Sequence, residues 1–311
     1  MRETVDGISL RNKRKIMLTE KAGGTKSLLF GGLVTFLRMC LFKVIATGPI
    51  PNHIAFIMDG NRRYAKKHNF VEGYGHKAGY SSLVLMLGHC FELGVKYVTV
   101  YAFSIDNYKR RPDIVKFLMD LMLEKIEQLL DKEGLVNQYG LRIYFIGNMK
   151  LLSEPVRAAA EKVMKATEKN KRAVLLVCVP YASTDEIVNA VKESCENKRR
   201  EIQTHVATKL ANGASEGVEV REELRKLANI NLVDVEKHMH MRVVPDPDIL
   251  IRSSGETRLS NFLLWQTANC QLYSPAALWP ELDIRHLVWA VLNFQRSYQY
   301  LEKKKQKKIS E

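Results

Sequence analysis

Short, continuous apolar runs alternate along the chain with longer segments of helical periodicity. The runs have the length of strands and are rich in β-branched and aromatic residues. Strands that are apolar on both sides must be covered on both faces, and strand–helix–strand connections make neighbouring strands parallel. We therefore predict an α/β fold, with a mainly parallel central sheet flanked by helices. The predicted strands lie at 53–58, 95–103, 141–147, 173–179 and within PDILIR (247–252), and the predicted helices at 76–93, from Pro112, from Ser153, after Ser183 and at 283–302.

Length and composition favour one globular domain with flanking segments. With 311 residues and 46% apolar content, the chain can bury one large core. We place the main domain at 49–302 and interpret 194–228, which is polar and interrupted by Gly-Ala-Ser-Glu-Gly, as a surface insertion. Residues 1–48 form a basic and apolar N-terminal segment, and 303–311 form a basic tail.

Charge and cysteine usage narrow the class of partner and the compartment. The formal net charge of +14 suits a polyanionic partner, which could be nucleic acid, an anionic membrane surface or a phosphorylated substrate. The five cysteines are widely spaced and form no CxxC pair, so neither a disulfide framework nor a zinc site is indicated. We expect the main domain to face a reducing compartment.

An apolar segment precedes the main domain. Residues 28–45 read LLFGGLVTFLRMCLFKVI, which is short for a membrane span and is interrupted by Arg38 and Lys43. We predict an N-terminal apolar helix that lies at a membrane surface, where basic residues nearby would attract anionic lipid; packing on the core or on a partner chain is the alternative. The basic residues are Arg11, Lys13, Arg14, Lys15, Lys21 and Lys26.

Polar side chains collect where three of the predicted strands end. Ligands of parallel α/β sheets bind beyond the carboxyl ends of the strands. Arginines bind phosphate oxygens in pairs of hydrogen bonds, helix N-termini add backbone N–H groups, and one or two carboxylates can hold Mg²⁺ through its water shell. The sequence therefore predicts a diphosphate site. Its residues are Asp59, Asn61, Arg62, Arg63 and His76 after the first strand, Ser104, Asp106, Asn107, Arg110 and Arg111 after the second, and Arg252, Ser253, Ser254, Glu256, Arg258 and Ser260 after the last.

Four sequence blocks resemble one family. HIAFIMDGNRRYAKK, GHKAGY, YAFSIDNYKR and DILIRSSGETRLSNFLLWQ resemble, in order and spacing, the cis-prenyltransferases, which include the undecaprenyl and dehydrodolichyl diphosphate synthases. The similarity runs from about Pro49 to Tyr300 and is greatest to eukaryotic, plant-type catalytic subunits. It implies the cis-prenyltransferase fold and condensation of isopentenyl diphosphate onto an allylic primer, farnesyl diphosphate, with formation of a Z double bond. The product would be a long-chain polyprenyl diphosphate for dolichol synthesis and protein glycosylation. No DDxxD pair of the trans family is present.

The resemblance also assigns roles to residues. Asp59 would hold Mg²⁺ and, with Asn61, Ser104 and Asn107, would form the catalytic group that orients the reactants or assists proton removal. The allylic diphosphate would be surrounded by Gly60, Arg62, Arg63, His76 and Arg110. The diphosphate of isopentenyl diphosphate would be bound by Arg252, Arg258 and Ser260. Helix residues Leu85, Leu87, Cys90, Phe117, Leu118, Leu121 and Met122 are expected to wall an apolar tunnel.

The chain departs from the bacterial pattern at several positions. Glu72 stands where bacterial members have an arginine, Asp106 replaces a glutamate, and Gln271 replaces a metal-binding glutamate. Bacterial homodimers end in an Arg-x-Gly that completes the neighbouring active site, whereas this sequence ends in QYLEKKKQKKISE. The resemblance then implies a heteromer with a Nogo-B-receptor-like subunit, at the cytosolic face of the endoplasmic reticulum membrane.

Other interpretations stay open at this level. A rubber-type or shorter-chain cis-polyisoprenoid synthase would have the same motifs, because spacing does not define tunnel depth. A non-catalytic subunit of such a complex is a second class, although the Asp-Gly-Asn and arginine pattern is intact here. An RNA-binding protein is a third, but no RNP1-like run, KH loop or zinc knuckle is present, so we expect no nucleic-acid partner.

Overall fold

The computed structural model describes residues 26–71, 73–131, 134–211, 225 and 228–310, which form parts of two compact units, Met1–Pro49 and Ile50–Glu311. In the first unit, Lys26–Ile45 form helix α2, along which large apolar side chains such as Phe36 and Val44 are exposed. No helix within the described ranges is both long enough and apolar enough to cross a membrane. Glu72 and the predicted basic cluster upstream of Lys26 lie outside the described residues.

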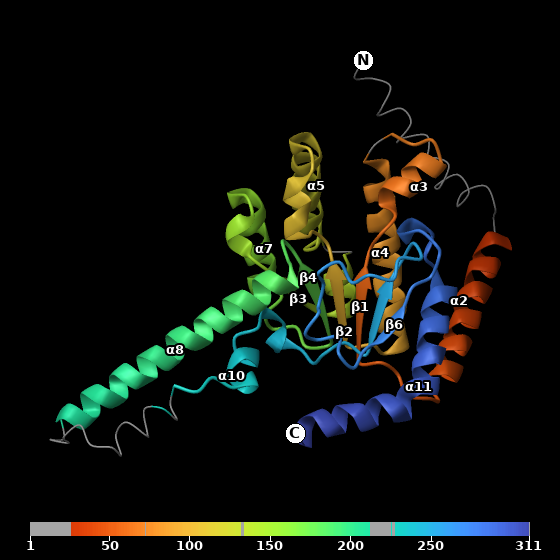
Figure 1. Ribbon diagram of the computed structural model, residues 1–311. Coiled ribbons are helices and arrows are strands. Elements are labelled where there is room, and N and C mark those ends of the chain that lie inside the picture. The colour runs from red at the N-terminus through yellow and green to blue at the C-terminus, as the bar shows by residue number, and fades with distance from the viewer. Residues whose placement is uncertain (1–25, 72, 132–133, 212–224, 226–227, 311) are drawn as a thin grey trace. The chain divides into compact units, whose positions relative to one another are not determined.

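The second unit is built on a parallel sheet of six strands within its described residues, in the order β3-β4-β2-β1-β5-β6 (Figure 1). All neighbouring strands are parallel, as predicted. The sequence did not predict β6, because three residues at a sheet edge give too short a pattern to recognise. The strands are β1 (His53–Ile57), β2 (Tyr97–Tyr101), β3 (Leu141–Ile146), β4 (Ala173–Cys178), β5 (Ile249–Arg252) and β6 (Gln271–Tyr273).

The predicted helices are present, with additional short ones. Helix α8 continues without a break into the first part of the predicted insertion, through residues 194–211 (Figure 1). Its polar side chains pair along the helix, as Lys198 does with Glu201, so a polar sequence can extend a helix that projects from the sheet. The helices of this unit are α3 (Asn61–Lys67), α4 (Tyr74–Leu93), α5 (Pro112–Gln128), α6 (Leu135–Tyr139), α7 (Glu154–Ala166), α8 (Ser183–Ala211), α10 (Leu232–Glu236) and α11 (Ile284–Ser310), with 3₁₀ helices at Ile105–Lys109, Met149–Leu151, His240–Val243 and Trp279–Glu281.

Strand β1 lies in the middle of the core, and all five of its residues are buried. Ala55 packs in a cluster with Phe262 and Leu263 from the loop that follows β5. Phe56, which points to the opposite face, meets the ring of Trp279 edge-on, with 5.7 Å between ring centroids. Burying a side chain of this size contributes about 1.5–3 kcal/mol. The end of β1, and the residues that follow it, are therefore held in a fixed position.

Candidate active site

The carboxyl ends of β2, β1 and β5 meet at one edge of the sheet. Ile57 at the end of β1 is in register with Tyr101 on one side and with Arg252 on the other. The loops after these three strands surround a cavity of about 750 Å³. The expectation that the three polar loops come together is therefore confirmed.

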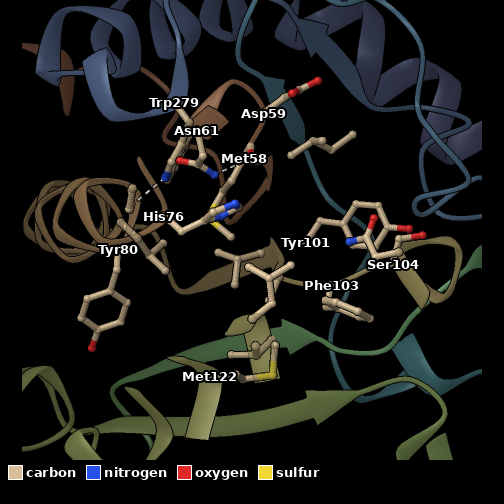
Figure 2. A pocket seen from close by; sticks show the side chains of 18 of the residues that line it. Met58, Asp59, Asn61, His76, Tyr80, Tyr101, Phe103, Ser104, Met122 and Trp279 are labelled. Atoms are coloured by element: carbon tan, nitrogen blue, oxygen red, sulfur yellow. Dashed lines mark hydrogen bonds between the residues drawn. The ribbon is translucent and has the colours of Figure 1, made fainter. Parts of the chain in front are cut away.

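The cavity is polar at one end and apolar at the other (Figure 2). The apolar part lies between α4 and α5, where side chains at helical spacing point into it. Of the predicted tunnel residues, Leu87, Leu118, Leu121 and Met122 line the cavity. The polar lining consists of Asp59, Asn61, Arg62, His76, Ser104, Asp106, Asn107, Arg110, Lys125, Arg252, Arg258, Ser260 and Asn261.

Three of the predicted wall residues lie elsewhere. Leu85 is 65% exposed, because it stands two positions before Leu87 and so falls on the opposite side of α4. Cys90 is fully buried in the core beyond the cavity. Phe117 is not among the lining residues, and its ring fills the space that a Cβ on Gly73 would need.

Asp59 is fixed by hydrogen bonds to its backbone. Its carbonyl oxygen accepts hydrogen bonds from Ser253 Oγ at 2.6 Å, from Ser254 Oγ at 2.9 Å and from the backbone N–H of Trp279 at 2.9 Å. The next residue, Gly60, has φ of +103°, and a Cβ there would overlap the Ser254 hydroxyl. A glycine is required at this turn both for its backbone conformation and for the close approach of the loop after β5.

The Asp59 carboxylate is held ionised by two arginines. Its Oδ2 accepts a hydrogen bond from Arg252 Nη2 at 2.8 Å, and its Oδ1 lies 3.5 Å from Arg63 Nη2. Burial is the largest single influence and would raise the pKa of Asp59. The hydrogen bond and charge of Arg252, together with Arg63 and the Gly60 N–H, outweigh it, so this pKa lies below its ordinary value.

Arg252 is the most buried cation of the site, at 5% exposure. Besides its bond to Asp59, its Nη1 donates to Ser260 Oγ at 2.6 Å and to the Arg258 carbonyl. Its Nε is buried and has no hydrogen-bond partner among the described residues. A buried guanidinium with one unused donor at the cavity edge is suited to a phosphate oxygen.

Arg63 and Arg258 are bridged by the carboxylate of Glu256, one of the polar residues that the sequence placed at the end of the last predicted strand. Glu256 Oε1 lies 3.7 Å from Arg63 Nη2, and Glu256 Oε2 accepts a hydrogen bond from Arg258. Arg258 lines the cavity, whereas Gly60 and Arg63 are not among its lining residues. Both arginines are at least half exposed, so these ion pairs are weak and a diphosphate can compete for them.

His76 and Arg110 both line the cavity and lie close enough for the charge of Arg110 to act on the imidazole. Burial, followed by the positive charges of Arg110 and Arg62, lowers the pKa of His76 to about 4. The imidazole is therefore neutral near pH 7 and can donate a hydrogen bond without adding charge. Burial and the charge of Arg62 lower the pKa of Arg110, opposed by Asp59, but a guanidinium stays protonated.

The loop after β2 begins with a 3₁₀ turn. Ser104 caps it by accepting the Asp106 N–H at 3.2 Å, and the Asp106 carboxylate is drawn outward by Lys109 at 2.7 Å. Asn107 lines the cavity beside Ser104. On α3, the Oδ1 of Asn61 is buried without a partner in the described structure, while its Nδ2 donates weakly to the Met58 carbonyl at 3.3 Å. That oxygen lies against Gly79 of α4, where a Cβ would overlap it.

The residues of the site fit Mg²⁺ only if most of its coordination comes from the bound diphosphate and water. The described residues contain no group of three or more His, Cys, Asp or Glu side chains that could hold a metal. Asp59 offers one ionised carboxylate, and Mg²⁺ is commonly bound by one or two carboxylates together with substrate phosphates and water. Gln271 pairs with Ile249 at the amino end of β5 and is not a lining residue, so it lies away from this carboxylate.

Some lining residues were not singled out from the sequence. Tyr80 is four residues after His76, and Lys125 is four residues after Leu121, so each continues a helical stripe that faces the cavity. Lys125 Nζ lies 5.1 Å from the centroid of the Tyr80 ring and bonds to Glu124 and Gln128. Asn261 and Trp279 also line the cavity, and Trp279 is in addition a buried packing residue. Helical spacing would have found the first two; no local signal marks the others.

The family model described as "Putative undecaprenyl diphosphate synthase" matches residues 57–301. The chain is 61% identical over 284 residues to "Dehydrodolichyl diphosphate synthase 6" of Arabidopsis thaliana, which covers 91% of this chain and 95% of that protein. It is 50% identical to a "Rubber cis-polyprenyltransferase" of Hevea brasiliensis, with 92% and 99% covered. It is 38% identical to a human "Dehydrodolichyl diphosphate synthase complex subunit", with 88% and 75% covered.

A solved structure is similar in fold. The crystal structure of lavandulyl diphosphate synthase from Lavandula x intermedia, in complex with dimethylallyl diphosphate, has a TM-score of 0.62 and 25% sequence identity. It covers 79% of this chain and 95% of that one. Together with the match over most of the second unit, these similarities show that the chain belongs to the cis-prenyltransferase family of undecaprenyl and dehydrodolichyl diphosphate synthases.

Proposed function

We propose that the protein elongates an allylic diphosphate, farnesyl diphosphate, by condensing it with successive molecules of isopentenyl diphosphate. Each condensation forms one Z double bond in the product. The observation that carries this proposal is one cavity with a cationic end and an apolar end. A cavity of about 750 Å³ falls within the range of sites that enclose small molecules, about 300–1,000 Å³, so its size suits farnesyl diphosphate. The apolar end suits the isoprenoid tail and the cationic end suits its diphosphate.

In each condensation the C1–O bond of the primer breaks and its diphosphate leaves. C4 of isopentenyl diphosphate bonds to C1, and one proton is lost. Negative charge develops on the leaving diphosphate, so cations already in place stabilise the transition state. We assign this task to Arg62, Arg63 and Arg110, with Gly60 forming the turn between β1 and the arginines of α3. Neutral His76 donates a hydrogen bond to the same group.

The second diphosphate does not leave and needs a separate set of groups. We assign it to Arg252, Arg258 and Ser260, since Arg252 is buried, has a donor to spare and already holds the Ser260 hydroxyl. Bound Mg²⁺, held by Asp59, would supply further positive charge for the departing diphosphate. Asp59 also orients Arg252 through their direct hydrogen bond.

The cavity lining also includes two amide side chains and a hydroxyl, from α3 and from the loop after β2. We assign Asn61, Ser104 and Asn107 to orientation of the reacting carbons or assistance with proton removal.

The activity is tested by incubating the purified chain with farnesyl diphosphate, labelled isopentenyl diphosphate and Mg²⁺, and separating the products by size. We expect a ladder or band of polyprenyl diphosphates, and we expect Asp59→Ala to abolish it. An undiminished rate in that variant would refute the role of the carboxylate, and no incorporation by the wild-type chain, with or without a partner, would refute the proposed activity.

We further propose that the product serves dolichol synthesis. The name of the Arabidopsis relative supports this, whereas the Hevea relative favours rubber-type products as the second candidate. Product length decides between them, and the same assay measures it. A non-catalytic role is disfavoured by the complete set of cavity arginines and Asp59.

Partner and membrane are also part of the proposal. The human relative is named as a subunit of a complex, which supports a heteromer with a Nogo-B-receptor-like subunit. The exposed apolar residues of α2 support attachment to the cytosolic face of the endoplasmic reticulum membrane. A rate of elongation that the partner does not increase, or fractionation away from membranes in cells, would argue against these assignments.

A further inference from the structure

The loop that carries Ser260 has an unusual backbone. Ser260, Asn261 and Leu263 have φ of +50°, +59° and +46°, the left-handed region that residues other than glycine seldom adopt. Asn tolerates this conformation better than most residues, whereas Ser and Leu do not. Such a run persists only where surrounding contacts hold it, and left-handed residues of this kind gather at ligand sites.

Two contacts anchor the loop in the core. Phe262 is fully buried and stacks on Tyr101, with 4.4 Å between ring centroids and 14° between ring planes. Leu263 is also fully buried. These contacts fix the apolar side of the loop, but they do not fix its polar side, which faces the cavity.

The polar side is held by the first turn of α8. The Thr184 N–H donates to Asn261 Oδ1 at 3.1 Å, and Asn261 Nδ2 donates in return to Thr184 Oγ1 at 2.9 Å. The Ser183 N–H donates to the Asn261 carbonyl at 2.8 Å, and Ser183 Oγ accepts the Leu264 N–H at 3.0 Å. We call these four hydrogen bonds the α8 clasp.

The clasp connects two loops of the site that come from opposite sides of β1. The turn that leads from β4 into α8 also binds the loop after β2, because the Ile105 N–H donates to the Tyr181 carbonyl at 3.1 Å and Ser104 pairs with Tyr181. On its other side, Asn261 precedes Phe262 and follows Ser260, whose Oγ accepts from Arg252. The start of α8 thus helps to fix the positions of Ser260 and Arg252, which we assign to the second diphosphate.

We infer that Asn261 is a positioning residue for the diphosphate that stays on isopentenyl diphosphate, acting through Thr184 at the start of α8. This inference rests on the proposed function. Its side chain holds the left-handed loop so that Ser260 Oγ and the Arg252 guanidinium face the cavity together. Without the clasp, the loop relaxes, and the subsite for the second diphosphate loses affinity while the subsite for the primer does not.

The test uses variants that separate conformation from hydrogen bonding. Asn261→Gly keeps the left-handed backbone and removes both side-chain bonds, whereas Asn261→Ala removes the bonds and also disfavours the conformation. Thr184→Val removes the hydroxyl and keeps the β-branched shape, and Thr184→Ser keeps the hydroxyl. The last variant is the matched control and should behave as the wild type.

Steady-state kinetics give the first readout. We expect the KM for isopentenyl diphosphate to rise about tenfold in Asn261→Gly and severalfold in Thr184→Val, with the KM for farnesyl diphosphate changed less than twofold. Asn261→Ala should raise the same KM and lower the melting temperature further. The double variant Asn261→Gly/Thr184→Val should be no worse than Asn261→Gly, because both remove the same bond. Equal rises in the two KM values, additive effects of the two substitutions, or loss of thermal stability alone would overturn the inference.

Binding without turnover separates this inference from the proposed activity. Titration calorimetry of the wild type and of Asn261→Gly with isopentenyl diphosphate in the presence of Mg²⁺ needs no condensation. Weaker binding by the variant supports the clasp even if the chain proves inactive as a polymerising enzyme. Equal binding by both proteins overturns the clasp even if the wild type elongates farnesyl diphosphate normally.

Discussion

Asp59→Asn removes one negative charge from the centre of the site while keeping the shape of the side chain. The amide oxygen can still accept the hydrogen bond from Arg252, which is 2.8 Å away in the native protein. What disappears is the attraction between two ions, one of them buried. At an effective dielectric constant near 20, unit charges at this distance attract by about 6 kcal/mol before desolvation is counted.

The net effect on stability is smaller than this attraction. Burying a charged carboxylate costs free energy, and this cost is absent in the variant. Arg252 also retains its hydrogen bonds to Ser260 and Arg258. We expect a net loss of about 1–3 kcal/mol in the free energy of unfolding. For a domain of this size, that lowers the melting temperature by roughly 2–6 °C.

The pH dependence gives the prediction its sign. Since the pKa of Asp59 is lower in the folded protein than in the unfolded chain, its contribution is fully present above the ordinary carboxyl pKa of 3.8 and is lost as the pH falls through the lowered value. The difference in melting temperature between wild type and variant should therefore be largest at pH 6–7 and should shrink in acid. Calorimetry over this range measures it.

Glu154→Gln is the control for this experiment. Glu154 forms an ion pair with Arg157 on the surface of α7, where its side chain is 70% exposed. Such pairs contribute little, so we expect a change of at most about 1 °C. The reasoning about Asp59 would be refuted if Asp59→Asn melted with the wild type at pH 7, or if the difference persisted unchanged at low pH. We also expect the elongation rate of Asp59→Asn to be at least about 100-fold lower than that of the wild type.

Three further outcomes follow from the geometry. Because the pKa of His76 is about 4 when folded and near 6.5 when unfolded, stability should fall as the pH drops from 6.5 towards 4, by about 3 kcal/mol at most, and this segment of the pH–stability curve should vanish in His76→Asn. Gly60→Ala and Gly94→Ala both introduce a side chain at φ near +100°, so each variant should lose about 1–2 kcal/mol in the free energy of unfolding. Only the alanine at position 60 overlaps a neighbour, so only Gly60→Ala should also lose most of its elongation activity. Equal activities of the two variants would contradict the close approach at Gly60. Leu121→Trp narrows the apolar end of the cavity and should shorten the products by several isoprene units on chromatography, whereas Leu85→Trp, on the exposed side of α4, should leave them unchanged.

The strands and long helices were predictable because each carries its own periodicity. Apart from His53, the runs at 53–58 and 173–179 are apolar, and this pattern is typical of strands covered on both faces. The short elements α3, α6 and α10 and the edge strand β6 were not predicted, because they are too short for a period to show. Helical spacing also separates Leu87 from Leu85, which a plain count of apolar residues cannot do.

The residues of the site were predictable from the sequence, but the contacts among them were not. The positions of Asp59, Arg62 and Arg252 at strand ends follow from the order of strands and turns along the chain, and the family motifs assign each a role. The sequence could not show that Glu256 bridges Arg63 and Arg258, or that Gln271 lies at the opposite end of β5 from Asp59. Those relations depend on the path of a loop and on strand register.

By itself, the sequence determined that this protein is a parallel α/β chain with a cationic, carboxylate-poor edge, because hydrophobic periodicity and residue chemistry are local properties. Only the tertiary structure decided which of these groups act together. The order β2-β1-β5 brings Arg252 into contact with Asp59, 193 positions earlier in the sequence, and the first turn of α8 reaches Asn261, 77 positions later. Such pairings arise from packing around a shared core, where neighbours in space are chosen by burial and register and leave no mark in the local sequence.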